Sequence, residues 1–317
     1  MVTRRQFGLG LGLMATARVS VPFARAAQTQ PVAWPRQIVR QFAEIEARCG
    51  GRLGVGVLDP TTGRAGGYRE HELFPMCSIH KALGAAAILA RVDRGEERLD
   101  RRLHFDAGEV LPYSPGTKAH AGGEGMTLAA VCEAAVTLSD NTAANLMLGA
   151  IGGPAALTAY VRALGDPITR LDRTEPTLNE ALPGDPRDTT SPLAIAADLS
   201  ALLLGDALSP ASRRQLSDWL LAGKTGDARL RAGVPRGWRV GEKTGTGDNG
   251  TANDVGIIWP PQHNGVVVTA FVTGSTAARD VQDTAIADVA RAVVKSFLIP
   301  QQTDEGDGFP TPPLSAD

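Results

Sequence analysis

Residues 78–89 read SIHKALGAAAIL, with a serine and a lysine three positions apart at the start of an apolar, alanine-rich run. The run predicts a helix beginning near Pro75-Met76, and residues three apart on a helix share a face. Ser78 is a weak nucleophile until a base takes its proton, and a desolvated Lys81 one turn away can be that base. The helix N-terminus also directs N–H groups towards an oxygen that becomes negative. Taken alone, such a pair is more commonly a serine cap beside a solvated lysine.

Three further motifs follow in the order Ser139-Asp140-Asn141, Glu175-Pro176-Thr177-Leu178-Asn179 and Lys243-Thr244-Gly245. In the first, serine and aspartate suit the N-cap of a helix over residues 141–150. The functional interpretation is that Ser139 passes a proton to a leaving nitrogen and Asn141 bonds a substrate amide. Each motif alone is weak, but their joint order indicates a serine acyl-transferase that can hydrolyse its own ester.

The last motif, with Thr246 after it, is expected at the end of a strand. Lys243, Thr244 and Thr246 would bind an anionic carboxylate there, and Gly245 would let a substrate backbone lie close. A strand-end turn with a surface lysine is the alternative. The overlapping pattern Gly245-x-Gly247-x-x-Gly250 matches a dinucleotide fingerprint, but a strand follows it rather than a helix. We therefore expect a hairpin turn and no cofactor.

No metal is expected. His80 projects away from the face that carries Ser78, and we interpret it as packing or surface. The other four histidines show no metal-ligand spacing, and Cys-x-x-Cys is absent.

The composition is that of a soluble globular protein: 317 residues, 43% hydrophobic and 21% charged. Three cysteines, an odd number, argue against a disulfide framework, so stability must come from the core. Residues 1–26 carry four arginines and no acid, so their removal takes the formal net charge from -2 to -6. An acidic protein is a poor nucleic-acid binder.

Residues 1–26 are predicted to be an export signal. Arg4-Arg5 precedes a mildly apolar run over residues 8–17, and Ala24-Arg25-Ala26 has the small-x-small pattern of a cleavage site. We interpret the segment as a twin-arginine signal; an ordinary secretory signal or a cytoplasmic protein with a basic start are the alternatives. No segment approaches the ~20 apolar residues of a membrane span. We expect a periplasmic protein that meets the export machinery and has no stable membrane anchor.

Strand-like and helical patterns give the expected layout. Residues 35–49 have helical spacing, a hairpin is expected over residues 52–69, and the middle of the chain is mostly helical. Three more strands (residues 238–243, 253–259 and 266–274) and a helix over residues 281–298 follow. Strands at both ends predict an α/β (α+β) fold, an antiparallel sheet flanked by helices with a helical subdomain inserted. Residues 299–317 are predicted to be disordered.

With these motifs in view, the chain resembles the class A serine β-lactamases from residue 52 to residue 298. This family shares three motifs with the penicillin-binding proteins: Ser-x-x-Lys, Ser-Asp-Asn and Lys-Thr-Gly. The resemblance implies a five-stranded sheet and a catalytic domain over residues 27–298. Its sheet part would comprise about residues 35–75 and 223–298, and its helical part about residues 76–222. It implies hydrolysis of penicillins and cephalosporins by a monomer without a cofactor.

The resemblance also implies a role for each motif residue. Ser78 is the nucleophile, Lys81 and Glu175 share the acylation base, and Ser139 shuttles a proton. Glu175 and Asn179 hold the hydrolytic water in a loop closed by an Arg173–Asp188 ion pair. The residues implied to contact the substrate are Tyr113 at the entrance, Asn141, Arg229, Lys243, Thr244, Gly245 and Thr246. The N–H groups of Ser78 and Thr246 would form the oxyanion hole.

The chain also departs from the family pattern. Ile79-His80 replaces a more usual Thr-Phe pair behind the nucleophile. Carbapenem-hydrolysing members have a cysteine at the position of Cys77 that forms a disulfide. In this chain Gly247 occupies the position of the second cysteine, so carbapenem hydrolysis is not expected. Ala85 likewise replaces the partner of Cys132. The alternative functions are a penicillin-binding DD-peptidase, which normally lacks the Glu175/Asn179 pair, and a non-hydrolysing β-lactam sensor.

Overall fold

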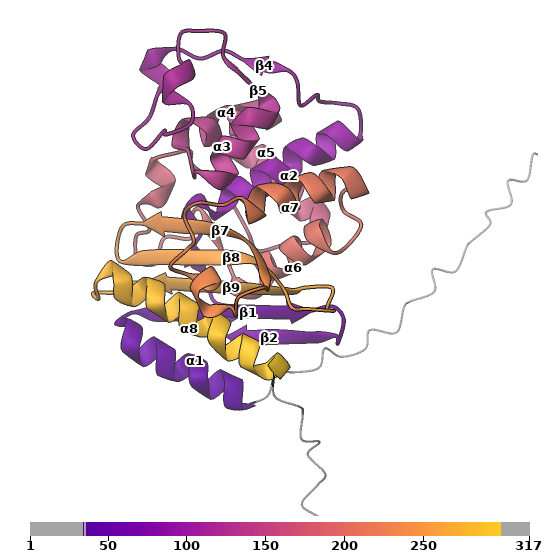
Figure 1. Ribbon diagram of the computed structural model, residues 1–317. Helices are drawn as coiled ribbons and strands as arrows, with labels where there is room; N and C mark the ends of the chain where they lie inside the picture. The colour runs from indigo at the N-terminus through magenta and orange to yellow at the C-terminus, as the bar shows by residue number, and fades with distance from the viewer. Residues whose placement is uncertain (1–33, 35, 299–317) are drawn as a thin grey trace, which may run out of the picture. The chain divides into compact units, whose positions relative to one another are not determined.

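The structure is a computed structural model that describes Trp34 and residues 36–298. Five antiparallel strands form its main sheet in the order β2-β1-β9-β8-β7 (Figure 1). The strands are β1 (Arg52–Asp59), β2 (Arg64–Tyr68), β7 (Arg239–Gly247), β8 (Thr251–Trp259) and β9 (Val266–Thr273). The predicted mixed fold, with a sheet built from both ends of the chain, is confirmed. The predicted export signal and the predicted disordered tail lie outside the described residues.

Two helices from opposite ends of the chain cover one face of the sheet. These are α1 (Arg36–Cys49) and α8 (Arg279–Leu298), which also pack on each other (Figure 1). The helical spacing predicted for α1 places Ile38, Phe42 and Ile45 in the core. They meet the buried strand residues Leu53, Val55 and Val57, which alternate along β1 as strand geometry requires.

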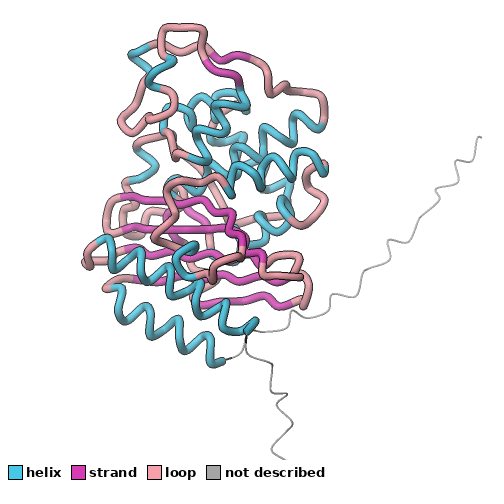
Figure 2. The backbone as a smooth tube through the Cα atoms, viewed as in Figure 1, coloured by secondary structure: helices cyan, strands magenta, loops and turns pink. Residues whose placement is uncertain are grey.

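The other face of the sheet packs against the helical part of the chain (Figure 2). Its helices are α2 (His80–Asp93), α3 (Leu128–Thr137), α4 (Asn141–Ile151), α5 (Pro154–Leu164), α6 (Pro192–Leu203) and α7 (Pro210–Leu221). The Phe271 ring of β9 lies 5.7 Å from the Phe74 ring, and both side chains are fully buried. One continuous apolar core therefore joins the sheet to these helices.

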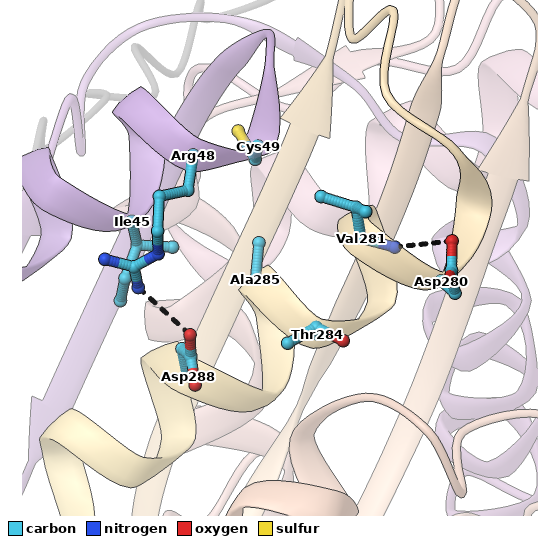
Figure 3. Close-up of a pocket in the computed structure, with 8 residues that line it drawn as sticks. All are labelled: Ile45, Arg48, Cys49, Asp280, Val281, Thr284, Ala285 and Asp288. Atoms are coloured by element: carbon cyan, nitrogen blue, oxygen red, sulfur yellow. Dashed lines mark hydrogen bonds and ion pairs between the residues drawn. The ribbon is translucent and has the colours of Figure 1, made fainter.

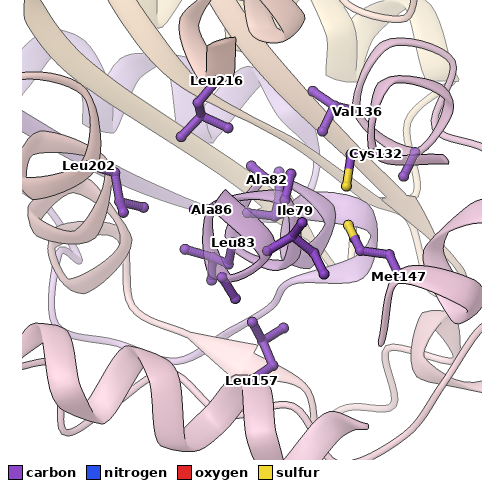
Figure 4. Packing of buried hydrophobic residues seen from close by; sticks show 14 of the residues in the cluster. Ile79, Ala82, Leu83, Ala86, Cys132, Val136, Met147, Leu157, Leu202 and Leu216 are labelled. Carbon is purple, nitrogen blue, oxygen red and sulfur yellow. The ribbon is translucent and has the colours of Figure 1, made fainter. Parts of the chain in front are cut away.

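Helix α2 runs through the middle of this core. The side chains around it come from five other helices (Figure 4): Cys132 and Val136 of α3, Met147 of α4, Leu157 of α5, Leu202 of α6 and Leu216 of α7. A helix that is apolar on every side is buried, and the small alanines of α2 let its neighbours approach. The lysine near its start is thereby carried into the interior.

Short strands and 3₁₀ turns join the larger elements. They are β3 (Phe74–Pro75), η1 (Cys77–Ile79), β4 (Arg102–Leu103), η2 (Ala107–Glu109), η3 (Lys118–His120), β5 (Met126–Thr127), η4 (Thr177–Asn179), β6 (Thr189–Thr190) and η5 (Leu230–Gly233). Over the described part of the chain, no single helix is long and apolar enough to cross a bilayer. Only α4 and α5, bent by 70° from each other, reach that length and composition together.

The predicted end of β7 at residue 243 is wrong. The strand continues to Gly247, because residues 243–247 all pair with β8, from Lys243 opposite Val255 to Gly247 opposite Thr251. The Lys-Thr-Gly motif therefore lies within a strand at the edge of the sheet. The hairpin turn predicted for residues 245–250 is shorter than expected, because only residues 248–250 connect β7 to β8. The first turn of the nucleophile helix is also tighter than expected, since η1 precedes α2.

A groove between α1 and α8 is separate from the motif residues (Figure 3). It has a volume of about 220 Å³ and is lined by Ile45, Arg48, Cys49, Asp280, Val281, Thr284, Ala285 and Asp288. An ion pair of 3.0 Å between Arg48 and Asp288 spans it. It contains none of the predicted catalytic residues, which lie instead at the junction of the sheet and the helices.

Shortening a core side chain of α2 should destabilise the protein strongly. Leu83 is fully buried, and removing three carbons from such a site typically costs about 2–5 kcal/mol. We expect Leu83→Ala to lower the free energy of unfolding by that amount in urea denaturation. The matched control is Leu73→Ala, at a leucine that is 43% exposed. Equal losses in the two variants would contradict the position assigned to α2.

Candidate active site

The nucleophile turn brings Ser78 and Lys81 into contact. Lys81 Nζ lies 2.9 Å from Ser78 Oγ, as their spacing predicts, and both residues are buried. Cys77, directly before the serine, has φ +49°, a conformation that non-glycine residues adopt rarely and that is often found at functional sites. Met76 N donates to Asp188 O at 2.8 Å and Asn253 Nδ2 donates to Pro75 O at 2.8 Å. Long-range hydrogen bonds thus hold the turn in place.

Lys81 is the centre of the site. Besides Ser78, its ammonium lies 2.9 Å from Glu175 Oε1, 2.8 Å from Ser139 O and 2.8 Å from Asn141 Oδ1. Burial lowers the pKa of Lys81, and the nearby negative charge of Glu175 opposes that shift without cancelling it. An amine whose pKa lies below its usual value is unprotonated for a larger fraction of the time at neutral pH, and in that form it can accept a proton.

Glu175 approaches the nucleophile from a separate loop. Its Oε1 accepts from Ser78 Oγ at 3.4 Å, and its Oε2 accepts from Asn179 Nδ2 at 2.5 Å. Burial alone would raise the pKa of Glu175, but the charge of Lys81 and the hydrogen bonds from Lys81 and Asn179 outweigh burial, so this pKa is lowered. The carboxylate is therefore ionised at neutral pH and available as a base.

The loop that carries Glu175 is closed by a buried ion pair. Arg173 Nε lies 2.6 Å from Asp188 Oδ2, and Asp188 also accepts from the Asp172 and Arg173 N–H groups at 2.7 and 2.9 Å. Asn145 holds the middle of the loop, accepting from Glu175 N and donating to Glu175 O, both at 2.9 Å. The backbone around the base is therefore fixed at several points.

The Ser139-Asp140-Asn141 motif both caps a helix and contributes side chains to the site. Asp140 caps α4, accepting from Ala143 N at 2.8 Å, and it also accepts from Thr117 N at 2.9 Å. Ser139, with φ +59°, is thereby left pointing between the two lysines: its Oγ lies 3.5 Å from Lys81 Nζ and 3.1 Å from Lys243 Nζ. A hydroxyl between two amines can accept and pass on a proton.

Lys243 and Arg229 form the positive wall of the site. Burial lowers the pKa of Lys243 well below its usual value, and the nearby Lys81 lowers it further. Arg229 Nη2 donates to Thr246 Oγ1 at 2.9 Å, while its Nε pairs with Asp283 at 2.8 Å. Thr244 Oγ1 lies 2.6 Å from Thr225 Oγ1. These contacts join the motif strand to a guanidinium distant in sequence.

Gly245 is required for a contact different from the one expected. A Cβ at this position would lie 2.6 Å from Met76 O, so the glycine lets β7 approach the nucleophile turn of the chain itself. Tyr113 lies at the rim, 59% exposed, with φ +57°. Its backbone carbonyl accepts a hydrogen bond from Asn141 N at 3.1 Å, which connects Tyr113 to the rest of the site.

The structure therefore brings the predicted residues together, with Tyr113 at the edge. Sequence reasoning missed Asn145, Asn253, Thr225 and Asp283. Asn145 is one helical turn after Asn141, a spacing that could have revealed it; the others carry no local signal. His80 lies in the core: burial lowers its pKa to about 4, and its Nδ1 lies 2.9 Å from Cys77 O. Among the described residues, no three His, Cys, Asp or Glu side chains are grouped to hold a metal ion.

Comparisons with known proteins agree with this site. A sequence model described as the β-lactamase enzyme family matches residues 37–297. The chain is 41% identical to β-lactamase L2 of Stenotrophomonas maltophilia over 297 residues, 92% of this chain and 98% of that protein. It is 40% identical to β-lactamase CTX-M-97 of Escherichia coli over 284 residues, 90% of this chain and 97% of that protein. The solved structure of an ancestral (GNCA) class A β-lactamase has a TM-score of 0.81 and 63% identity, covering 82% of this chain and 100% of that chain.

A serine–lysine pair buried between an antiparallel sheet and a helical subdomain is typical of serine acyl-transfer enzymes. The chain belongs to the β-lactamase enzyme family, in its class A.

Cys77 lies next to Gly247, the position at which the family resemblance would place its disulfide partner. A Cβ at Gly247 would lie 2.6 Å from Cys77 Sγ, so the two positions are adjacent and glycine leaves the sulfur unbridged. Cys49 and Cys132 are also free thiols, and all three are buried. Burial raises the pKa of each thiol, which disfavours the reactive thiolate.

Thiol counting should therefore find three free groups. We expect three equivalents of 5,5′-dithiobis(2-nitrobenzoate) to react under denaturing, non-reducing conditions, because no thiol has a partner. In the native protein the same thiols should react far more slowly, since each is buried. Fewer than three equivalents after unfolding would mean that one cysteine forms a disulfide.

Proposed function

We propose that this chain hydrolyses the β-lactam ring of penicillins and cephalosporins through an ester on Ser78, and so confers antibiotic resistance. The observation that carries the proposal is the position of Glu175, whose Oε1 lies 3.4 Å from Ser78 Oγ while its Oε2 is held by Asn179. A general base beside the nucleophile, supported by an amide, is what hydrolysis of an acyl-enzyme requires.

In acylation, Ser78 Oγ attacks the β-lactam carbonyl carbon and loses its proton to the pair of Lys81 and Glu175, which share this role. The negative oxygen of the tetrahedral intermediate is bound by the N–H groups of Ser78 and Thr246. The carbonyl carbon–nitrogen bond then breaks, and Ser139 gives its proton to the leaving nitrogen. Lys81 Nζ, 3.5 Å from Ser139 Oγ, returns a proton to that hydroxyl.

The substrate carboxylate binds to the positive wall of Lys243, Thr244, Thr246 and Arg229. An anion arriving beside Lys243 favours its protonated form and so opposes the lowering of its pKa. Gly245 leaves the edge of β7 open, Asn141 bonds the substrate amide, and Tyr113 lines the entrance.

In deacylation, Glu175 removes a proton from a water that it holds with Asn179, and the resulting hydroxide attacks the ester carbon. The bond from the ester carbon to Ser78 Oγ breaks, and Glu175 gives the proton taken from the water to Ser78 Oγ, 3.4 Å away, so that both residues return to their starting states. This step separates the proposed function from a DD-peptidase or a β-lactam sensor, which would form the same ester. Glu175 and Asn179 are in contact in this chain, which favours the hydrolase.

Removing the base should trap the ester. Glu175→Gln keeps the size of the side chain but loses the base, which typically costs ~10²- to 10⁴-fold in rate, or roughly 3 to 5 kcal/mol. Stopped-flow kinetics with a penicillin should show a burst of one equivalent followed by very slow turnover, and mass spectrometry should detect the acyl-enzyme. The control, Ser78→Ala, should form no adduct.

Acylation by Glu175→Gln is also expected to slow if Glu175 contributes to that step. Steady-state turnover close to the parental rate would mean that the water is activated elsewhere. An adduct on Ser78→Ala would mean that the nucleophile is a different residue.

We also propose that the protein works in the periplasm as a monomer, exported by residues 1–26. Support comes from the Arg4-Arg5 pair, the apolar run and the Ala24-Arg25-Ala26 pattern. A periplasmic position would place the enzyme between the antibiotic and its target.

Replacing the arginine pair should stop export while leaving the enzyme active. We expect Arg4→Lys/Arg5→Lys cells to lose penicillin resistance although their lysate still hydrolyses nitrocefin, because the charge is kept and only the paired guanidinium groups are lost. The matched control, Arg18→Lys/Arg25→Lys, should remain resistant. Unchanged resistance in the first variant would indicate an ordinary secretory signal.

A further inference from the structure

Two buried carboxyl groups lie together at the base of the loop that carries Glu175. Asp166 follows α5 and Asp198 belongs to α6, and the two residues are 6% and 2% exposed. Their carboxyl groups lie within hydrogen-bonding reach of each other. An ionised carboxylate can only accept hydrogen bonds, so a bond between two carboxyl groups needs one proton.

The remaining contacts indicate which carboxyl group holds the proton. Asp166 Oδ1 accepts from Ile168 N at 2.6 Å and from Thr169 N at 3.1 Å, which suits an ionised acceptor. Asp198 Oδ2 is buried and meets no hydrogen-bond donor in the part of the chain that the structure describes, so this oxygen is free to carry a proton. A proton on Asp198, donated to Asp166, satisfies both groups.

The charges around Asp198 favour its neutral form. Burial raises the pKa of Asp198 to about 9, the nearby charge of Asp166 adds to the shift, and the charge of Arg162 opposes it. Arg162 Nη1 is bonded to the carbonyls of Asp166 and Thr169, at 2.6 and 2.7 Å, rather than to a carboxylate.

Tyr160 of α5 also faces Asp198, and burial raises the pKa of its phenol, which stays neutral. Beyond that phenol lie Asp93, at the end of α2, and Arg94, which follows it; these two charges oppose each other in their effect on Tyr160.

Asp166 connects this pair to the neck of the loop, which we define as residues 169–170 and 189–190. The Asp166 carboxylate fixes Thr169 N, and Thr169 Oγ1 lies 2.6 Å from Thr190 Oγ1 across the neck. Arg170 N donates to Thr189 O at 3.0 Å. The second half of the neck is β6, which pairs with β3 just before the nucleophile turn. The position of the neck therefore affects both Glu175 and Ser78.

We propose that Asp198 is a positioning residue of this enzyme: it remains protonated in the folded protein, donates that proton to Asp166, and so fixes the neck of the loop that carries Glu175. Its effect on turnover rests on the role proposed above for Glu175, whereas its protonation does not.

The protonation is tested by the pH dependence of stability. A carboxyl group whose pKa is raised by folding keeps its proton in the folded state and loses it in the unfolded state, so its contribution to stability falls as pH rises above ~4. Asp198→Asn donates the same hydrogen bond without titrating. The Tm of this variant minus that of the parent should therefore increase by about 2–4 °C per pH unit between about pH 5 and pH 8. A constant difference would mean that Asp198 is ionised when folded, and would overturn the proposal.

The positioning role is tested by deacylation kinetics. Asp198→Leu keeps the branched shape of the side chain but removes the donor, and we expect acyl-enzyme from a penicillin to decay at least ~10-fold more slowly, since small misplacements of a catalytic group cost up to ~10²-fold. Asp198→Asn should decay at the parental rate. Parental decay in the leucine variant would overturn the positioning role.

If the leucine variant does not fold, Asp198→Val, a smaller side chain that also lacks a donor, provides the second test of the positioning role. We expect the same slower decay of its acyl-enzyme, and decay at the parental rate would overturn that role. A failure of the Glu175 mechanism would be seen separately, as normal turnover by Glu175→Gln, and would leave the pH experiments unaffected.

Discussion

Burial of the Lys81 ammonium beside the Glu175 carboxylate is the constraint on which the rest of the site depends. Both side chains are fully excluded from solvent, at a distance of 2.9 Å. Taking two charges out of water costs several kcal/mol for each ion, and their attraction offsets this only with good geometry and further hydrogen bonds. The nucleophile turn, the start of α4 and the loop between α5 and α6 all supply partners. Removing any one of them leaves a buried polar group unsatisfied, so the site forms as a unit.

The fold makes this arrangement possible by bringing segments from far along the chain to one place. Strands from both ends form the sheet, and Asn253 of β8 reaches the backbone just before the nucleophile. The loop with Glu175 returns through β6, which pairs with β3 on the other side of the same turn. Helix α2 then carries Lys81 into a core that excludes water, which strengthens each electrostatic interaction in the site. Stability and chemistry therefore use the same contacts.

The sequence predicted the parts of the site that local spacing encodes. Ser78 and Lys81 share a helix face, Asp140 caps a helix, and the glycine-rich turn after β7 joins two strands; all of these follow from short-range rules. The end of β7 was misplaced because pairing with β8, rather than propensity, extends the strand through the motif. Asn253, Thr225 and Asp283 escaped notice because their partners lie far away in the sequence. The hydrogen bond between Asp166 and Asp198 likewise depends on how α5 and α6 pack, which no local pattern specifies.

The contact at Gly247 limits how such an enzyme can change by mutation. A Cβ there would lie 2.6 Å from Cys77 Sγ and 2.7 Å from Asn179 O, so at this position only a hydrogen fits between the nucleophile turn and the hydrolytic loop. Any larger residue must push the two apart, and would alter attack on the lactam and release of the ester in one step. A natural variant with a larger residue at position 247 would therefore change both the acylation and the deacylation rate. We expect substitutions that restore activity to such a variant to lie in the loop that carries Glu175 rather than in β7.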